Sequence, residues 1–387
     1  MLKYYLYISI IIFGSGILYF QTDAAQFKYQ ANGYLKALPS VTFDHLNQEN
    51  YDLYIIHNRL NQRLDISSNL TLRLEMRNRY FAGSYVEAIP GYREQLEMDP
   101  GLVDLSFTWG SDEQFVHTIF DRVLLEWYKG PWEITAGRQR INWGINTVWN
   151  PNDLFNVFNF LDFDYVERPG TDAVRVAYAL PNMKKLELVY SPGALADDDI
   201  ISALYGFNTN TYDIQIIAGK YLDNITAGFG WAGNIGTAGW KGEFTWFHPY
   251  ARFSDTSSRV SVSTGIDYIF SNGIYLQLAW LYNEVDAFGN LANTFQYTAD
   301  ARQLMPFEQT ILLQGNYALN PIINVSLAAM YEPNDKGLIL FPTVAWSLTD
   351  NIVASFIAQS FLGNVEEYQA VSTAIFADIK WNFSIVE

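Results

Sequence analysis

Arginine is concentrated in one part of this chain, where it alternates with apolar residues. Of the 14 arginines, 11 lie between Arg59 and Arg175, a span under a third of the length, and carboxylates accompany them. Facing rows of guanidinium and carboxylate groups would create a strong transverse field in a narrow aqueous space, which orients dipolar solutes and filters ions. In the alternative, the arginines only neutralise carboxylates and stiffen a wall. The candidate residues are Arg59, Arg63, Arg73, Glu75, Arg77, Arg79, Arg122, Glu126, Arg138, Arg140 and Arg175.

A second group of polar and aromatic residues follows, between residues 142 and 171. A segment this rich in phenylalanine would be poorly solvated if it stood in water. We therefore expect it to fold inward and to narrow the space that the arginines line, with Arg168-Pro169-Gly170 turning the chain back. The residues assigned to this constriction are Trp149, Asn150, Pro151, Asp153, Phe155, Phe158, Phe160, Asp162, Asp164 and Arg168.

Metal binding is a competing interpretation of the acidic residues in this segment. Asp153, Asp162, Asp164 and Glu167 supply oxygen ligands at spacings that a surface calcium site could use, but they do not match the twelve-residue calcium-loop pattern. The glycines follow neither the phosphate-loop nor the dinucleotide-binding pattern. We predict no metal and no cofactor, and interpret these carboxylates as partners of the arginines.

Histidine, the side chain most often used in acid–base catalysis, occurs only four times. His117, near Asp112, Glu113 and Asp121, is the best candidate for such a group. A lone histidine beside carboxylates is more often structural or solvated, so we predict that the protein is not an enzyme.

The arginines need elements that point alternate side chains in opposite directions. In residues 70–79, Leu70, Leu72, Leu74 and Met76 alternate with Thr71, Arg73, Glu75, Arg77 and Arg79. This period of two indicates a β-strand. A water-soluble sandwich would alternate as well. The 16% aromatic content, with tryptophan and tyrosine at strand ends, instead favours a transmembrane barrel that is apolar outside and polar inside.

The turns divide the chain into about eighteen antiparallel strands. Sixteen is the alternative, because the hairpins between residues 198 and 235 are short and rich in glycine. The fold class is therefore an all-β transmembrane barrel with an inward-folded loop near 142–171. Short turns fall on one side, and an even strand number places both ends of the barrel in the periplasm. Long loops are expected outside, near residues 37–50, 81–117, 142–171, 284–307 and 362–371.

The two ends of the chain suggest where the protein is located. Residues 1–25 have the charge, apolar run and small-residue exit of a cleaved secretory signal peptide, which leaves 26–387 as the barrel. The stretch 372–383 resembles the carboxy-terminal strand by which the barrel-assembly machinery recognises outer-membrane proteins, although Ser384–Glu387 extend beyond it. The expected location is the outer membrane of a Gram-negative bacterium. The net charge of −17 argues against nucleic acid as a partner.

One motif resembles a known family. The order Gly137-Arg138-Gln139, Trp143-Gly144, Asn150-Pro151-x-Asp153 and Arg168-Pro169-Gly170 is similar to the central motif of porin-like outer-membrane barrels of uncharacterised function in Gram-negative bacteria. The match covers roughly residues 130–180. This resemblance implies a channel-like barrel and names no cargo.

The function expected from the sequence is passive diffusion of small polar or anionic solutes. Its partners would be outer-membrane lipids, the solutes and the assembly machinery, and a homo-oligomer is left open. One alternative is a closed barrel that serves as a structural or partner-binding component of an envelope or export complex. Another is a transporter of hydrophobic solutes, suggested by Phe155, Phe158 and Phe160.

Overall fold

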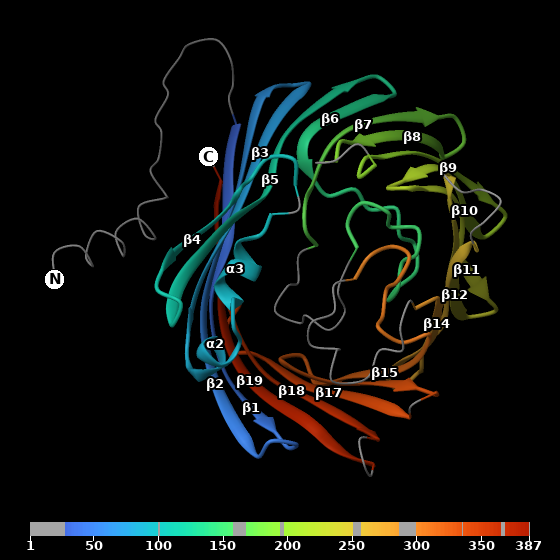
Figure 1. Ribbon diagram of the computed structural model, residues 1–387. Coiled ribbons are helices and arrows are strands. Elements are labelled where there is room, and N and C mark those ends of the chain that lie inside the picture. Colours follow the sequence, from blue (N-terminus) through green and yellow to red (C-terminus); the bar gives the residue numbers. More distant parts are fainter. Residues whose placement is uncertain are drawn as a thin grey trace.

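The protein is a closed antiparallel β-barrel. The computed structural model describes residues 28–99, 101–157, 168–193, 197–250, 257–285, 299–334, 336–364 and 368–386. Nineteen strands in this part of the chain form one sheet, which closes because β1 (Lys28–Asp44) pairs with both β2 (Glu49–Ser67) and β19 (Tyr368–Val386). Figure 1 looks into the resulting ring of strands. Closure leaves no sheet edge at the seam between first and last strands, and the predicted all-β barrel is confirmed.

The remaining elements follow in sequence order. They are β3 (Leu70–Ala82), α2 (Ser84–Ala88), α3 (Tyr92–Glu97), β4 (Ser106–Gly110), β5 (Gln114–Lys129), β6 (Trp132–Gln139), β7 (Thr171–Leu180), β8 (Lys184–Ser191), β9 (Ile200–Thr209), β10 (Tyr212–Tyr221), β11 (Asn224–Ile235), β12 (Ala238–Pro249), β13 (Arg259–Ile269), β14 (Tyr275–Asn283), β15 (Gln309–Asn320), β16 (Ile323–Glu332), β17 (Gly337–Ser347) and β18 (Ile352–Asn364). No helix in the described part of the chain is long and apolar enough to cross a membrane.

Eighteen strands make up the circumference, as predicted. β4 adds no position, because it pairs with residues 115–119 of β5 while β6 pairs with residues 123–129 along the same edge. The glycine-rich region between residues 198 and 235 forms the complete strands β9, β10 and β11, so the alternative of sixteen is wrong.

Two of the expected long loops are strands instead. Residues 37–44 continue β1, and β2 already begins at Glu49, with Asp44 accepting hydrogen bonds from the backbone N–H groups of Leu46 and Asn47 in the turn. Pro39, which has no N–H to donate, lies where the pairing of β1 with β19 passes from Ala37 to Ser40 without partners for the two residues between. The expected loop at 362–371 is likewise mostly the ends of β18 and β19.

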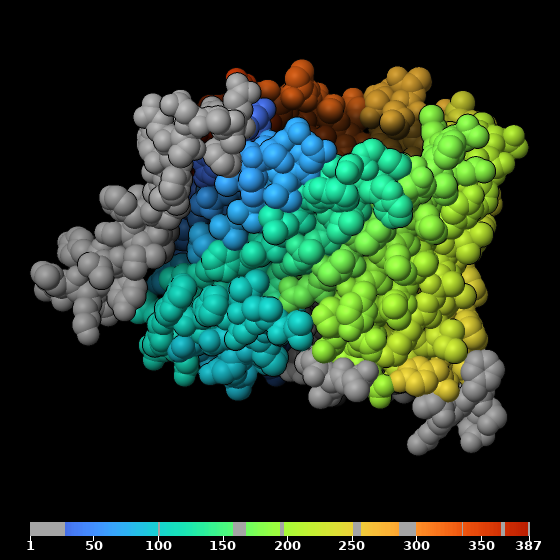
Figure 2. Space-filling view, turned by 90° about the horizontal axis from the view of Figure 1, so that it is seen from above, coloured from blue at the N-terminus to red at the C-terminus, as the bar shows by residue number. Residues whose placement is uncertain are grey.

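The two faces of the wall follow the predicted alternation. On β12, Glu243 and Thr245 are buried inside while Phe244 is exposed outside, and on β19 the exposed residues include Ile375, Ile379 and Trp381. Figure 2 shows the strands of one side running obliquely across this outer wall. The residues Ser384 and Ile385 still pair with Asn32 and Ala31, so the chain beyond Phe383 is part of the closing strand.

Three segments fold inward from the side of the long connections. The helices α2 and α3 pack on Leu38, Ile55, Phe81 and Phe115 through Val86 and Tyr92. Residues 141–157 and 299–308 contribute to two further apolar clusters; Trp149 and Met305 belong to one, and Trp143 and Ala301 belong to the other. The expectation that 284–307 stands outside is therefore wrong for its described second part, since apolar side chains such as Leu304 and Phe307 gain burial by turning in.

Candidate functional site

A buried carboxylate lies at the centre of the arginine-rich wall. The pairing of β3 with β5 shifts by one residue between Glu75 and Met76, which inserts Asp121 as an extra residue. Its Oδ2 lies 2.6 Å from Nη1 of Arg59 and 3.8 Å from Nε of Arg77. Arg59 also binds Glu75 at 2.7 Å, and its side chain is only 2% exposed. This part of the wall is a buried network of compensated charges.

Arginines nearer the short turns of the barrel are more accessible. Arg63 is 43% exposed and pairs with Asp65 at 2.9 Å, and Arg73 is 36% exposed and pairs with Glu126 at 2.9 Å. Arg175 lies between Glu133 and Glu187, at 2.6 and 2.9 Å. These guanidinium groups are held in place by carboxylates while part of their surface remains open.

The outer arginines Arg79 and Arg122 are buried. Arg79 donates a hydrogen bond to Nδ1 of His117, whose Nε2 lies 2.8 Å from Oγ of Ser106. Arg122 donates to the backbone oxygens of Asp121 and Arg168. His117 is thus buried among wall residues, which fits a structural role for the histidine.

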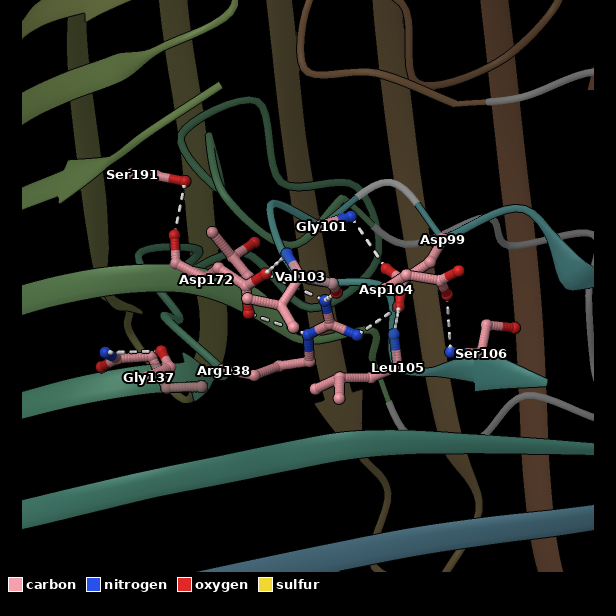
Figure 3. Close-up of polar contacts among 12 residues, drawn as sticks. Asp99, Gly101, Val103, Asp104, Leu105, Ser106, Gly137, Arg138, Asp172 and Ser191 are labelled. Carbon is pink, nitrogen blue, oxygen red and sulfur yellow. Dashed lines mark hydrogen bonds and ion pairs between the residues drawn. The ribbon is translucent and has the colours of Figure 1, made fainter. Parts of the chain in front are cut away.

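Arg138 is enclosed by protein atoms and is only 3% exposed. Gly137 has φ of 113°, and this backbone turns Arg138 to the same side as Thr135, three residues before it. The apolar Ile134 is thereby left on the opposite side. The guanidinium binds Asp172 through Nε and Nη2, both at 2.9 Å, and Asp99 through Nη1 at 2.6 Å (Figure 3).

Arg140 differs from Arg138, although both were assigned to the lumen. It follows the last residue of β6 and its side chain is exposed. Among the described residues it forms no ion pair, while its charge acts on Asp153 at longer range. Arg140 is therefore an exposed guanidinium directly beyond the end of β6.

Residues 141–157 are fixed to the opposite inner wall by a carboxylate. Oε1 of Glu243 on β12 accepts hydrogen bonds from the backbone N–H groups of Ile145 and Asn146, at 2.6 and 2.7 Å. Its Oε2 accepts one from Asn152 at 2.9 Å, and the side chain is completely buried. Three oriented N–H dipoles therefore stabilise this buried charge.

Other wall residues extend this attachment along four strands. The indole of Trp143 donates to Glu187 on β8, and Gln215 on β10 donates to the backbone oxygen of Trp143. Ser263 on β13 donates to the backbone oxygen of Trp149 at 2.8 Å. Thr245 on β12 donates to the side-chain oxygen of Asn152 at 2.7 Å. The segment is thus held closely against the wall from β8 to β13.

The base of the segment is closed by its own residues. The side chain of Asn156 accepts from the backbone N–H of Ile141 and donates to the backbone oxygen of Pro169, both at 2.5 Å. Arg168 pairs with the buried Asp153. Burial raises the pKa of Asp153, which lies in the segment and not on a strand, to about 6, against the opposing effect of Arg168.

The sequence motif corresponds to this anchoring. Gln139 donates to the backbone oxygen of Ala173 on the neighbouring strand, and Gly144 lies against Asn150, where a Cβ would come within 2.4 Å of its side-chain oxygen. A Cβ on Gly170 would lie 2.2 Å from the backbone oxygen of Asp121. The motif residues therefore fix how residues 141–157 and 168–170 meet the arginine wall.

The residues predicted to form the constriction lie partly in the inward segment and partly outside the described residues. Trp149, Asn150, Asp153 and Phe155 are buried in the inward segment with Pro151, as expected of a segment that folds inward. Phe158, Phe160, Asp162 and Asp164 lie outside the described residues. No group of three or more histidine, aspartate or glutamate side chains in the described part of the chain is arranged to hold a metal ion.

The wall residues that bind the inward segments were not predicted from the sequence. Neither Glu243, which binds the backbone of residues 145–152, nor Asn283, which binds the backbone of residues 304–307, is among the predicted site residues. The only signal for Glu243 was a carboxylate at an inward position of β12, far from the arginines. Its partners are backbone groups, which leave no trace in residue type.

Comparison with known proteins identifies the fold. No protein-family model matches the sequence, and no curated protein matches it. Among solved structures, OccK5 (OpdH) of Pseudomonas aeruginosa has a TM-score of 0.58 at 9% identity, covering 93% of this chain and 98% of that chain. The outer membrane protein OpdK of the same species has a TM-score of 0.59 at 9% identity, with 92% and 99% covered. OccAB4 of Acinetobacter baumannii has a TM-score of 0.56 at 8% identity, with 94% and 99% covered.

Proposed function

We propose that this protein is a porin-like channel of the Gram-negative outer membrane for passive diffusion of small polar or anionic solutes. The observation that carries the proposal is the set of accessible guanidinium groups, Arg63, Arg73 and Arg140, inside a closed barrel. Inside a narrow, low-dielectric pore, such groups raise the local concentration of anions. The likeness in fold to an outer membrane protein supports the location.

The motif supports a closer relationship. We assign the chain to the porin-like barrels that share the motif from Gly137 to Gly170, because its residues anchor the inward segment. The outer face of the barrel would contact outer-membrane lipids, and the barrel-assembly machinery would recognise its carboxy-terminal strand. A homo-oligomer is compatible with this function and is not required by it. We propose no enzymatic role, since His117 is buried with its ring nitrogens on Arg79 and Ser106.

The test is single-channel recording of the refolded protein in a planar bilayer. We expect a steady conductance that prefers chloride over potassium. In the variant Arg63→Ala/Arg73→Ala/Arg140→Ala the preference should fall by about threefold, the factor that corresponds to one kT of potential. Lys129→Ala, which removes a positive charge from the exposed last residue of β5, is the matched control and should leave the preference unchanged.

The same recording examines the closed-barrel alternative. That alternative is supported by the three inward segments, which pack in apolar clusters. An absence of conductance in the wild type and in the triple variant, with correctly folded protein, would contradict the channel and favour a structural or partner-binding role. An equal preference for chloride over potassium in the wild type and in every variant would show that these arginines do not determine ion selectivity.

A further inference from the structure

The inner faces of the first three strands are polar throughout next to the short turn between β2 and β3. These strands are neighbours in the wall (Figure 1), and side chains at directly opposite positions of paired strands share one face. Three consecutive rows of inward positions begin beside this turn. Taken from β1 to β3, the rows are Lys28, Asp65 and Thr71; Gln30, Arg63 and Arg73; and Asn32, Asn61 and Glu75. None of these positions carries an aliphatic side chain.

Two arginines face each other across the middle row. Arg63 on β2 lies directly opposite Arg73 on β3. Cross-strand neighbours have Cβ atoms about 5 Å apart, and like charges at such positions destabilise the sheet. Arg63 binds Asp65, which lies one row nearer the turn, and Arg73 binds Glu126 on β5. The two carboxylates that compensate the arginines are therefore both outside the row that the arginines share.

The same two strands show how an oxyanion satisfies such a pair. Arg59 and Arg77 are also directly opposite each other. One oxygen of Asp121 lies 2.6 Å from Nη1 of Arg59 and 3.8 Å from Nε of Arg77. Arg59 donates through all three of its side-chain nitrogens, and the acceptors are Asn61, Asp121 and Glu75. At this pair the protein itself supplies the oxyanion.

Arg63 and Arg73 each use a single nitrogen. Both donate through Nε, to Asp65 and to Glu126, at 2.9 Å. In the part of the chain that the structure describes, their Nη1 and Nη2 groups have no partner, and the side chains are 43% and 36% exposed. Guanidinium Nη groups form a rigid fork that matches a carboxylate. A carboxylate from the lumen can therefore bind this pair as Asp121 binds the buried one.

Amide side chains on β1 lie beside the arginine pair. Gln30 lies directly opposite Arg63, and the exposed Asn32 lies one row further from the turn. Oδ1 of Asn32 accepts from Asn61 at 3.0 Å, so its Nδ2 remains as a donor. The Gln30 amide has no hydrogen bond to another described residue, so it can donate and accept. We call Gln30, Asn32, Arg63 and Arg73 the arginine–amide site.

We propose that the arginine–amide site binds a small hydroxylated carboxylate, such as a sugar acid or a hydroxy acid. The carboxylate of this solute binds the arginine pair, and its hydroxyl groups bind the two amides. A solute with an apolar body gains nothing from the amides and finds no aliphatic side chain in the three rows. The site rests on the proposed channel function, because the solute reaches it through the lumen.

The test measures binding of three probes of equal carbon-chain length to the refolded protein. Gluconate has a carboxylate and hydroxyl groups, hexanoate has only the carboxylate, and sorbitol has only hydroxyl groups. Isothermal titration calorimetry in detergent gives the affinities, and interruption of the chloride current in a planar bilayer shows whether a bound probe lies in the conducting path. We expect gluconate to bind about tenfold more tightly than hexanoate, since two neutral hydrogen bonds are added, and sorbitol to bind least.

Two variants examine the two halves of the site. Arg73→Lys keeps the positive charge but loses the fork, so the affinity for gluconate should fall about tenfold, as loss of one charge-assisted hydrogen bond predicts. Asn32→Ala should lower it about fivefold and bring it closer to the affinity for hexanoate. Lys185→Gln is the matched control, because it removes a positive charge that is 50% exposed beside Glu187 on β8. This control should bind gluconate like the wild type.

Three results would overturn the arginine–amide site. They are no binding of gluconate to the wild type, equal affinities for gluconate and hexanoate, and a loss of affinity in Lys185→Gln as large as that in Arg73→Lys. The last would show that only the total charge of the lumen matters. Protein that binds gluconate but conducts no ions would instead contradict the channel and leave the site in place. Folding of each variant is checked by its heat-dependent migration in SDS gels.

Discussion

At the scale of single residues, the buried carboxylate of Glu243 decides where the inward segment lies. It accepts three backbone hydrogen bonds from residues 91 to 98 positions earlier in the chain. A glutamine at this position keeps the volume but loses the charge and turns one acceptor into a donor. Each backbone N–H left without a partner in a buried place costs about 1–3 kcal/mol.

Glu243→Gln should therefore release residues 144–153 from the wall without unfolding the barrel. We expect faster hydrogen exchange in this segment and a larger, noisier single-channel conductance. Glu113→Gln removes a charge from an exposed position next to β5 and serves as control. Unchanged exchange in Glu243→Gln would mean that the apolar cluster and the hydrogen bonds from Gln215, Thr245 and Ser263 are enough to hold the segment.

At the scale of elements, the inward segment formed by residues 299–308 depends on the last residue of β14. Asn283, the last residue of β14, is fully buried. Its amide donates to the backbone oxygens of Met305 and Phe307, and its oxygen accepts from the N–H groups of Leu304 and Met305. One side chain thus replaces the pairing that a strand would otherwise provide for this segment.

Asn283→Ala should detach residues 300–307 and widen the lumen from this side. Conductance should rise, while anion preference should stay near that of the wild type because no charge is removed. Asn324→Ala, at a position near the short turns, is the control. A conductance equal to that of the wild type would show that these residues do not border the conducting path.

The elements also show how far the sequence could be interpreted. Alternation along residues 70–79 predicted β3 and its inward arginines, because strand period and burial are local properties. β4 was not predicted, since a five-residue strand is defined only by its pairing with β5. The inward position of residues 300–307 depends on Asn283 and on an apolar cluster assembled from distant strands, so no local pattern could reveal it.

The sequence predicted which residue types form the candidate site, but it did not predict which of them are exposed and which are buried. Arg63, Arg73 and Arg138 carry the same charge and have similar sequence surroundings. Only the structure separates the partly exposed Arg63 and Arg73 from Arg138, which is enclosed by Asp99 and Asp172. Burial of a long side chain depends on which loop covers it, and that is a property of the assembled barrel.

At the scale of the whole molecule, the inward segments 141–157 and 299–308 share two apolar clusters. Val148 and Trp149 of the first segment pack in the same cluster as Leu304, Met305 and Phe307 of the second. Each segment is therefore held by polar contacts with the wall, among them those of Glu243 or Asn283, and by the other segment. Residues that share a cluster in this way do not respond independently to mutation.

The double variant Glu243→Gln/Asn283→Ala should then exceed the combined effect of the single variants. When one anchor is lost, the shared cluster still holds the released segment near the wall, and this support disappears when both anchors are absent. We expect conductance and hydrogen exchange in residues 144–153 to increase more than the product of the two single effects. Effects that simply multiply would show that the two segments border the lumen independently, and each could then be altered without disturbing the other.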